Sequence, residues 1–436
     1  MPTLEEQRRL LSRWSHRFGF GPKPGQFSRA LNSSIDSAFA TIVDTSPSQL
    51  DRNVIQGLLG IGDLGVQPAP NTPQVITYAN EKRRQIRALI LWWIDHMTTL
   101  DYPLAERMTW FWHGHWATSY QKVDEPLLNL IQNFTLRRNA LGNFRTMCRE
   151  MVLDPALILW LDGQSSTAKA PNENLARELM ELFILGVDRY TENDVKQAAL
   201  ALTGYRLKRS SGDVTFLPQL HFSNSLTILG RTSSFDGPSL TDYLVSQENC
   251  SRFIAERFWF RFVSSTSSIP KDGSLEQSFA NRDISSLLTT VARHPEFNNP
   301  AHSQVKAPLD WLISALRALN VGPYDYPNPD LLVNSIDSMG QKPFFPPNVG
   351  GWPADEAWLS TASTQTRISL AQTLVKFGDL SPIADIAAPL RIEAMADWLG
   401  VARWSDRTLA SFVGALNDPA RLTLLGLCSP EYVVNA

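Results

Sequence analysis

Apolar residues recur along most of this chain at intervals of three and four, the spacing that gathers them on one face of an α-helix. Prolines and Asp-Pro pairs separate several of these amphipathic segments, as at Asp154-Pro155. Thr191 followed by Asp194 is typical of a helix N-cap with an acidic residue in the first turn. The pattern predicts a mainly α fold, a multi-helix globular protein. The expected helices span residues 4–17, 80–99, 103–119, 125–151, 171–186, 193–203, 239–263, 274–294 and 305–319.

Two segments depart from the helical pattern. β-prone residues flanked by glycine, proline and polar residues predict a small β-hairpin excursion near residues 208–237. Prolines and paired glycines predict a compact, irregular Pro/Gly-rich loop near residues 340–353. We expect one large helical domain over residues 1–375, with the excursion as its candidate sub-boundary, and short C-terminal helices over residues 376–436 packed on it.

Composition narrows the classes of protein that the chain can represent. Of the 436 residues 43% are apolar and 13 are tryptophan, which excludes a disordered chain. The 40 basic and 43 acidic residues give a net charge of −3, which argues against nucleic acid as the main partner. The longest apolar runs, residues 88–94 and 156–161, are far shorter than the roughly 18 residues of a transmembrane segment. The first residues lack the apolar region of a signal peptide, so the compartment stays open.

The densest group of chemically interesting residues surrounds His113 and His115. Histidines at i and i+2 share a face of a strand and often bind one metal ion. On a helix they point roughly 200° apart, so one ion cannot take both. Hydrogen-bonded core histidines are the other interpretation. The helical alternative groups His113 with Glu106, Thr109, Trp110 and Tyr120, and His115 with Phe111, Trp112 and Ser119.

A second group lies on the predicted helix over residues 171–186. Glu173, Arg177 and Glu181 alternate in charge at intervals of four, which is typical of a solvated, self-paired helix surface. Asn174, Glu178 and Glu181 nevertheless fall within roughly a 60° arc of the helix. Clustered carboxylates of this kind can bind a divalent ion, or can differ in pKa so that they serve as acid and base. Both interpretations, a solvated surface and a carboxylate site, stay open.

Two weaker candidates complete the set. His221 lies in the β-prone excursion, where a single histidine is little evidence of a site. The Pro/Gly-rich loop carries Gln341, Asn348 and Trp352 and could form one wall of a binding cleft, or equally cover the core. The three cysteines are widely spaced without a CxxC pair, and the chain contains no GxGxxG, P-loop, HExxH, GxSxG or EF-hand motif.

Several long motifs resemble one known family. The segment FWHGHWATS (residues 111–119) resembles the FWHxHFATS segment of the domain of unknown function 1800 family, a large bacterial group. The resemblance runs in order from about residue 10 to about residue 375. It continues in RWSHRFGFGPKP, APNENLARELMELFILGV, YTENDVKQAALALTGY, RFIAERFWFRFV and GQKPFFPPNVGGWP followed by EAWLS.

The resemblance implies little about activity, because the family has none established. Its members are often exported and are commonly encoded beside the domain of unknown function 1501 family, which looks like the alkaline phosphatase and sulfatase group. A protein of that neighbouring family is therefore the expected partner. The family usually has Asp directly after the histidine of the third motif, whereas Phe222 follows His221 here. The matching positions are His113, His115, Asn172, Glu173, Arg177, Glu178, Glu181, His221, Gln341, Pro347, Asn348, Gly351 and Trp352.

These observations support one leading hypothesis, a metal-dependent, hydrolase-like enzyme. His113, His115 and Glu178 would be ligands of a divalent metal ion. The expected catalytic residues are Glu178, Glu181, Arg177 and His221, with Arg177 orienting an anionic group. The expected contacts to a small, saccharide-like substrate are Trp112, Trp116, Asn174, Gln341, Asn348 and Trp352.

Two other hypotheses compete with the enzyme. The first is a non-catalytic binding or assembly protein, in which the His, Glu and Arg side chains form a structural hydrogen-bond network. The second is a redox or haem-type protein with His113 or His115 as an axial ligand.

Overall fold

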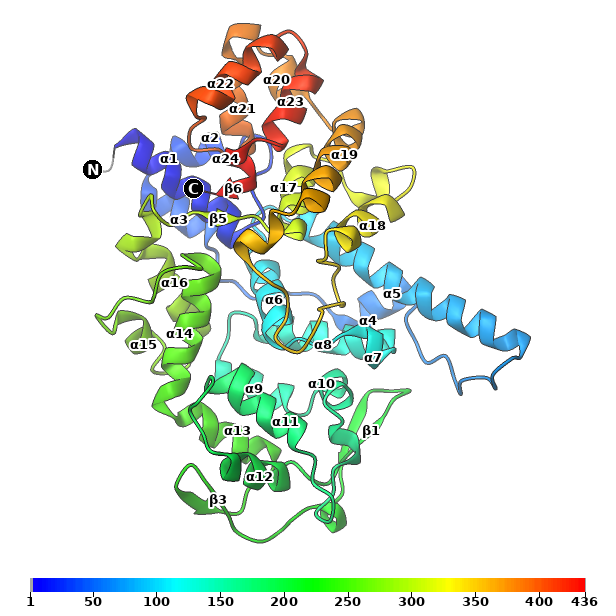
Figure 1. Cartoon of the computed structure of the whole chain (residues 1–436). Coiled ribbons are helices and arrows are strands. Elements are labelled where there is room, and N and C mark those ends of the chain that lie inside the picture. The colour runs from blue at the N-terminus through cyan, green and yellow to red at the C-terminus, as the bar shows by residue number, and fades with distance from the viewer. Residues whose placement is uncertain (1–2, 436) are drawn as a thin grey trace.

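Helices form 61% of the chain and strands 6%, so the predicted mainly α fold is confirmed. The computed structural model describes residues 3–435. The helices of the first half are α1 (Leu4–Arg13), α2 (Gln26–Leu31), α3 (Ile35–Ile42), α4 (Arg52–Leu59), α5 (Pro73–Thr99), α6 (Leu104–His115), α7 (Tyr120–Val123), α8 (Pro126–Asn139), α9 (Phe144–Met151), α10 (Pro155–Trp160), α11 (Glu173–Glu178) and α12 (Glu192–Ala201) (Figure 1).

The second half of the chain is also mainly helical, with shorter helices toward the C-terminus. These helices are α13 (Gly237–Ser246), α14 (Glu248–Phe262), α15 (Ser274–Ser278), α16 (Ile284–Arg293), α17 (Pro308–Ala318), α18 (Asp330–Ser338), α19 (Thr361–Phe377), α20 (Ser381–Ala384), α21 (Arg391–Leu399), α22 (Asp406–Phe412), α23 (Pro419–Leu427) and α24 (Pro430–Val433). Two π-helices, η1 (Trp14–Phe18) and η3 (Leu179–Ile184), continue α1 and α11. The predicted cap before α12 is confirmed, since Thr191 accepts from the amide of Asp194.

Three of the predicted helices are each divided in the structure. Residues 125–151 form α8 and α9, because Asn143 turns the backbone out of the helix and its side chain accepts the amide of Arg145 to start α9. Residues 239–263 form α13 and α14, which are separated by Gln247 in an extended conformation. Residues 274–294 form α15 and α16, with residues 279–283 between them. The apolar spacing continues across the first two breaks, so periodicity alone could not reveal them.

The two predicted exceptions to helix are also confirmed. The β-prone excursion forms two antiparallel hairpins rather than one, β1 (Tyr205–Lys208) with β2 (Asp213–Phe216) and β3 (Leu226–Ile228) with β4 (Arg231–Ser233). Residues 341–354 contain neither helix nor strand, apart from a single β-bridge between Asn348 and Gly351. This segment, called the 341–354 loop below, descends beside α6 (Figure 1).

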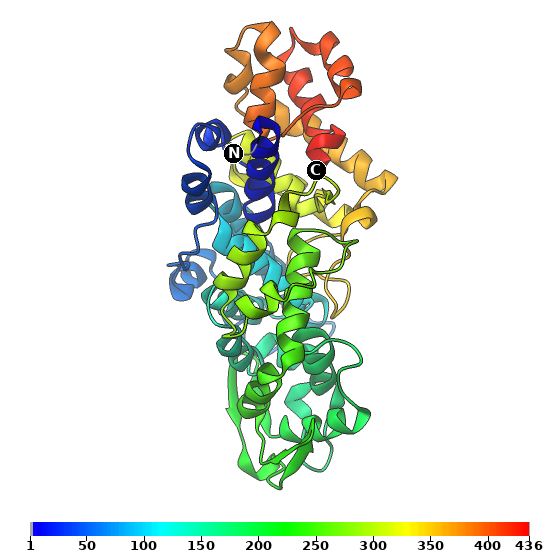
Figure 2. The same ribbon diagram turned by 90° about the vertical axis from the view of Figure 1, so that its left-hand side faces the viewer.

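The helices enclose two large hydrophobic cores, and the molecule is elongated along the line that joins them (Figure 2). The first core lies among α9, α12, α13, α14 and α16, and the second lies among α5, α17, α19, α21 and α23. Helix α6 contributes to both cores, with Trp112 in the first and Trp110 in the second. A helix buried on two sides holds its side chains in fixed directions, which is why α6 positions the candidate site.

The C-terminal helices α20–α24 pack on the second core, and strand β5 (Gln304–Val305) pairs with β6 (Val434–Asn435). The division of the chain at residue 375 stays a prediction. Within residues 3–435 no helix combines the length and the apolar character needed to cross a membrane.

Candidate functional site

The two histidines of α6 point into different parts of the molecule. The helix continues through His115, so the roughly 200° separation expected for positions i and i+2 applies. His113 packs with Trp110 in the second core, and His115 packs with Phe111 and Trp112 in the first. The helical grouping of side chains predicted from the sequence is therefore what the fold contains, and the two imidazoles do not converge.

His113 holds the 341–354 loop against α6. Its Nε2 atom accepts the backbone N–H of Phe344 at 3.1 Å, so in the neutral ring Nδ1 carries the proton. Nδ1 is buried without a hydrogen-bond partner. The rings of Trp93, Trp110 and Trp352 surround the imidazole, and burial lowers the pKa of His113 to about 3. The imidazole is neutral at ordinary pH and acts as a structural acceptor.

His115 caps the end of a π-helix. Its Nε2 atom lies 2.9 Å from the carbonyl oxygen of Phe183, in the last turn of η3. A carbonyl only accepts, so Nε2 carries the proton and Nδ1 presents a lone pair. Burial, and then the positive charge of Arg257, lower the pKa of His115 to about 3. The bond satisfies one of the carbonyls that the end of a helix leaves free.

The polar helix face of residues 173–181 is largely self-paired at the surface. Arg177 donates to both carboxylate oxygens of Glu192 at 2.8 Å and lies 3.4 Å from Glu173. Glu181 accepts from the hydroxyl of Tyr190. Glu178 is half-buried, and burial followed by the neighbouring Glu181 raises its pKa. Two members of the predicted charge ladder therefore pair with residues that follow it in the chain. Arg177 pairs with Glu192, and Glu181 pairs with Tyr190.

Other predicted substrate and catalytic residues have structural roles. His221 donates from Nδ1 to the carbonyl oxygen of Thr203, 3.1 Å away, beside the first hairpin. The Asn348 side chain is exposed and accepts the amide of Gly350 at 2.8 Å, which shapes the loop. Asn174 is also exposed, and its backbone amide donates to the side chain of Asn172.

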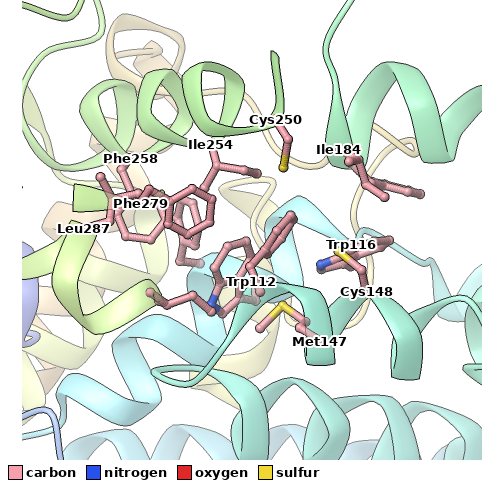
Figure 3. Close-up of a cluster of buried hydrophobic side chains, with 14 of the residues drawn as sticks. Trp112, Trp116, Met147, Cys148, Ile184, Cys250, Ile254, Phe258, Phe279 and Leu287 are labelled. Carbon is pink, nitrogen blue, oxygen red and sulfur yellow. The ribbon is translucent and has the colours of Figure 1, made fainter. Parts of the chain in front are cut away.

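Trp112 and Trp116 fill the first core rather than the wall of a cleft. Neither side chain has exposed surface. The Trp112 indole N–H donates to the carbonyl of Ala140 at 2.9 Å, and the Trp116 ring lies 4.5 Å from that of Phe183. Figure 3 shows both rings among Met147, Cys148, Phe258 and other apolar side chains of this core.

A pocket of about 80 Å³ lies where α6, α14 and the 341–354 loop meet. It brings together three of the predicted residues, His115, Gln341 and Trp352. The side-chain oxygen of Gln341 accepts the N–H of Leu309 at 2.9 Å, which fixes the amide at the pocket wall. The complete lining consists of Trp110, Phe111, Gly114, His115, Arg257, Phe260, Arg261, Gln341, Gly350, Trp352, Pro353 and Ala354.

Two arginines of α14 supply the charge of this pocket, and sequence reasoning missed both. Arg261 is 2.8 Å from Asp310, with which it forms an ion pair. Arg257 has neither an ion pair nor a hydrogen bond to any residue of 3–435, and its Nε atom is buried. Burial alone lowers the pKa of Arg257. The sequence signal for this pair was the segment RFWFR, in which two arginines at positions i and i+4 flank three aromatic residues.

The predicted metal ligands His113, His115 and Glu178 are not assembled into a ligand set. Residues 3–435 contain no group of three or more His, Cys, Asp or Glu side chains arranged to hold a metal ion. The pocket itself is lined by two arginines and no carboxylate. The residues of the pocket therefore do not fit a divalent cation, and metal binding stays a prediction.

The fold and the pocket define a class of protein: a mainly α protein with an aromatic-walled, positively charged pocket between two cores. The model of the family described as "Protein of unknown function (DUF1800)" matches residues 13–434, nearly the whole chain. The chain belongs to this family, as the sequence motifs indicated. Neither the curated proteins nor the solved structures contain a match to it.

Proposed function

We propose that this protein binds a small organic anion in the pocket between α6, α14 and the 341–354 loop. The observation that carries the proposal is Arg257, whose half-buried guanidinium lines the pocket, with its Nε buried, and has no carboxylate or other acceptor among the described residues. A half-buried cation without a protein partner is a favourable place for an anion to bind. An anion bound in the pocket supplies that partner.

The geometry of the pocket limits the chemistry of this anion. The planar guanidinium of an arginine matches a carboxylate, phosphate or sulfate group through two parallel hydrogen bonds. The Trp352 indole N–H, in the pocket wall, is also buried and has no acceptor among residues 3–435. A volume of about 80 Å³ holds the charged group and few further atoms. The aromatic rings of Trp110 and Phe111 suit the apolar face of the remainder, such as that of an acidic sugar.

His115 adds a second feature to the same pocket. Because Nε2 donates to the carbonyl of Phe183, the lone pair on Nδ1 is free. A neutral imidazole of this tautomer accepts hydrogen bonds, so it suits a hydroxyl group next to the anionic one. An anion that also carries a hydroxyl, as uronic acids do, therefore satisfies both Arg257 and His115.

Binding of inorganic sulfate and of glucuronate tests the proposal, with neutral glucose as the reference ligand. Titration is followed by the tryptophan fluorescence of Trp110 and Trp352. We expect saturable binding of at least one of the two anions, weakened at least about tenfold in Arg257→Met. The matched control is Arg252→Met, on the same helix, where the arginine is exposed and 2.9 Å from Glu256. No saturable binding of either anion, or equal binding in Arg257→Met, overturns the proposal.

Metal-dependent, hydrolase-like chemistry is the finer prediction from the sequence, and it is kept as a separate hypothesis. Its ligands would be His113, His115 and Glu178, and its test is elemental analysis of the purified protein. One equivalent of a divalent metal that is lost in both His115→Ala and Glu178→Ala would establish the site. Unchanged metal content in both variants rejects these ligands.

Association with a protein of the domain of unknown function 1501 family also stays a prediction. Gel filtration of the two purified proteins, alone and mixed, tests it directly. A new peak that contains both chains supports the association, and separate elution at micromolar concentration contradicts it.

A further inference from the structure

A second, smaller cavity of about 40 Å³ lies next to the anion pocket, and a lysine side chain lines it. The two share Phe260, Arg261 and Ala354 in their linings. The smaller cavity is formed by η1, α14, α17 and the paired C-terminal strands β5 and β6. Its distinguishing residue is Lys306, which directly follows β5 and is only 7% exposed.

The backbone around Lys306 is held firmly from two sides. Its N–H donates to the carbonyl of Val433 at 2.8 Å, and its carbonyl accepts from Arg367 at 3.0 Å. The side chain then crosses the ring of Tyr432, with Nζ 3.6 Å from the ring centroid. Tyr432 is fully buried and is itself fixed by a 2.7 Å hydrogen bond to Ser314. The amine is therefore presented to the cavity from a rigid frame.

The charged groups around this amine act on its pKa in opposite directions. No carboxylate of residues 3–435 lies within 4.0 Å of Nζ as an ion-pair partner. Asp310 raises the pKa of Lys306, although it already pairs with both Arg107 and Arg261, and Asp355 also lines the cavity. Burial is the largest cause of the shift and lowers the pKa, and the positive charge of Arg367 lowers it further. The result is a pKa of Lys306 well below its usual range.

We infer that Lys306 is a reactive amine that forms a reversible imine with a small aldehyde or 2-oxo acid. A neutral lysine amine in a desolvated site is the form that attacks carbonyl carbons. The nitrogen lone pair attacks the carbonyl carbon, and one amine proton passes to the carbonyl oxygen to give a carbinolamine. The hydroxyl then leaves as water with the second amine proton, and a carbon–nitrogen double bond remains. The step is a condensation without net oxidation or reduction.

The cavity favours a carbonyl compound that also carries a carboxylate. A volume of about 40 Å³ admits a few non-hydrogen atoms only, so the compound is small. Besides Lys306, the lining contains the three arginines Arg17, Arg107 and Arg261 and the two aspartates Asp310 and Asp355, and this excess of positive charge attracts a negative group. Glyoxylate is the smallest 2-oxo acid and is the probe of choice.

The test uses the full chain incubated with glyoxylate and cyanoborohydride near neutral pH, followed by peptide mapping. The reductant traps an imine as a stable carboxymethyl group on the lysine that formed it. Exposed lysines are protonated at this pH and react slowly. We expect the initial rate at Lys306 to exceed that at the exposed Lys376 at least about tenfold.

Two controls make the result decisive. In protein unfolded by guanidinium chloride the preference for Lys306 over Lys376 should disappear, because the preference comes from the folded cavity. Benzaldehyde, which is too large for the cavity, should show no preference in the folded protein. A rate at Lys306 equal to or below that at Lys376 in the folded protein overturns the inference, and it leaves the anion pocket at Arg257 untouched.

Discussion

Gly351 of the 341–354 loop packs directly on the carbonyl group of Gly114 in α6. Its backbone has a positive φ of 87°, and a Cβ at this position would overlap the Gly114 carbonyl oxygen. A residue with a side chain fits neither the backbone conformation nor the space. The close approach of these two glycines places Trp352 over the pocket, 4.9 Å from the ring of Trp110.

Gly351→Ala should therefore destabilise the protein and displace the loop. The strain of the left-handed backbone and the overlap with Gly114 predict a loss of about 1–3 kcal/mol in the free energy of unfolding. Chemical denaturation measures it. Gly57→Ala is the control, because a Cβ there meets nothing within 4 Å and glycine is unfavourable within a helix. Equal stability of Gly351→Ala and wild type contradicts the packing described.

Removal of the unpartnered charge should stabilise the empty protein. In Arg257→Met an apolar side chain replaces a half-buried guanidinium that has no acceptor among residues 3–435, so the free energy of unfolding should rise, by up to about 1 kcal/mol. The same variant should lose anion binding. Arg252→Met, whose arginine is exposed, should change stability by less than about 0.5 kcal/mol. A marked destabilisation of Arg257→Met would indicate a structural role for Arg257 and argue against a binding role.

Breaking the buried ion pair of α6 should instead lower the free energy of unfolding. Glu106 accepts from Arg137 Nε at 2.6 Å and from the Trp93 indole at 2.8 Å, and all three side chains are buried. Glu106→Gln leaves the Arg137 charge without its partner, so we expect a loss of about 3–5 kcal/mol in the free energy of unfolding. Thermal or denaturant unfolding measures it. A loss below about 1 kcal/mol would show that the pair is replaceable.

Stability should fall in mild acid because of the buried histidines. The pKa of His115 is lowered from 6.5 to about 3 in the folded protein, so the unfolded chain binds the proton more readily. The contribution is complete above about pH 6.5 and is lost progressively as the pH falls toward about 3. Between pH 7.5 and pH 5 the loss should be about 2 kcal/mol for this histidine.

His115→Gln isolates this effect, since glutamine can still donate to the Phe183 carbonyl but does not titrate. Its loss of stability between the same two pH values should be smaller than that of wild type by about 2 kcal/mol. NMR titration of the wild-type imidazole gives an independent measurement, in which His115 should stay neutral down to about pH 4. Titration near pH 6.5 would contradict the burial and the bond to Phe183.

Much of the fold was accessible from the sequence because helices depend on local spacing. The amphipathic segments, the cap at Thr191, the hairpin excursion and the irregular loop were all predicted. The interruption within residues 274–294 was missed, and so were those at Asn143 and at Gln247, where one backbone turn leaves the apolar period intact. The opposite directions of His113 and His115 followed from helix geometry alone once α6 was taken as a helix.

The candidate site was accessible only in part. Sequence reasoning found His115, Gln341 and Trp352, which line the pocket, since their motifs were long and specific. It also grouped Trp112 and Trp116 with them, although both lie inside a core. The side on which a tryptophan packs depends on neighbouring helices that are far away in sequence, so composition and motif could not decide it.

The sequence by itself determined the helices, the faces of each helix and the family. Only the tertiary structure decided which charged side chains form ion pairs. Arg257 and Arg261 are four residues apart on one helix, but Asp310 pairs with Arg261 and not with Arg257, which has no ion-pair partner within residues 3–435. Periodicity describes each helix separately, whereas pairing, burial and cavities depend on how distant helices pack together.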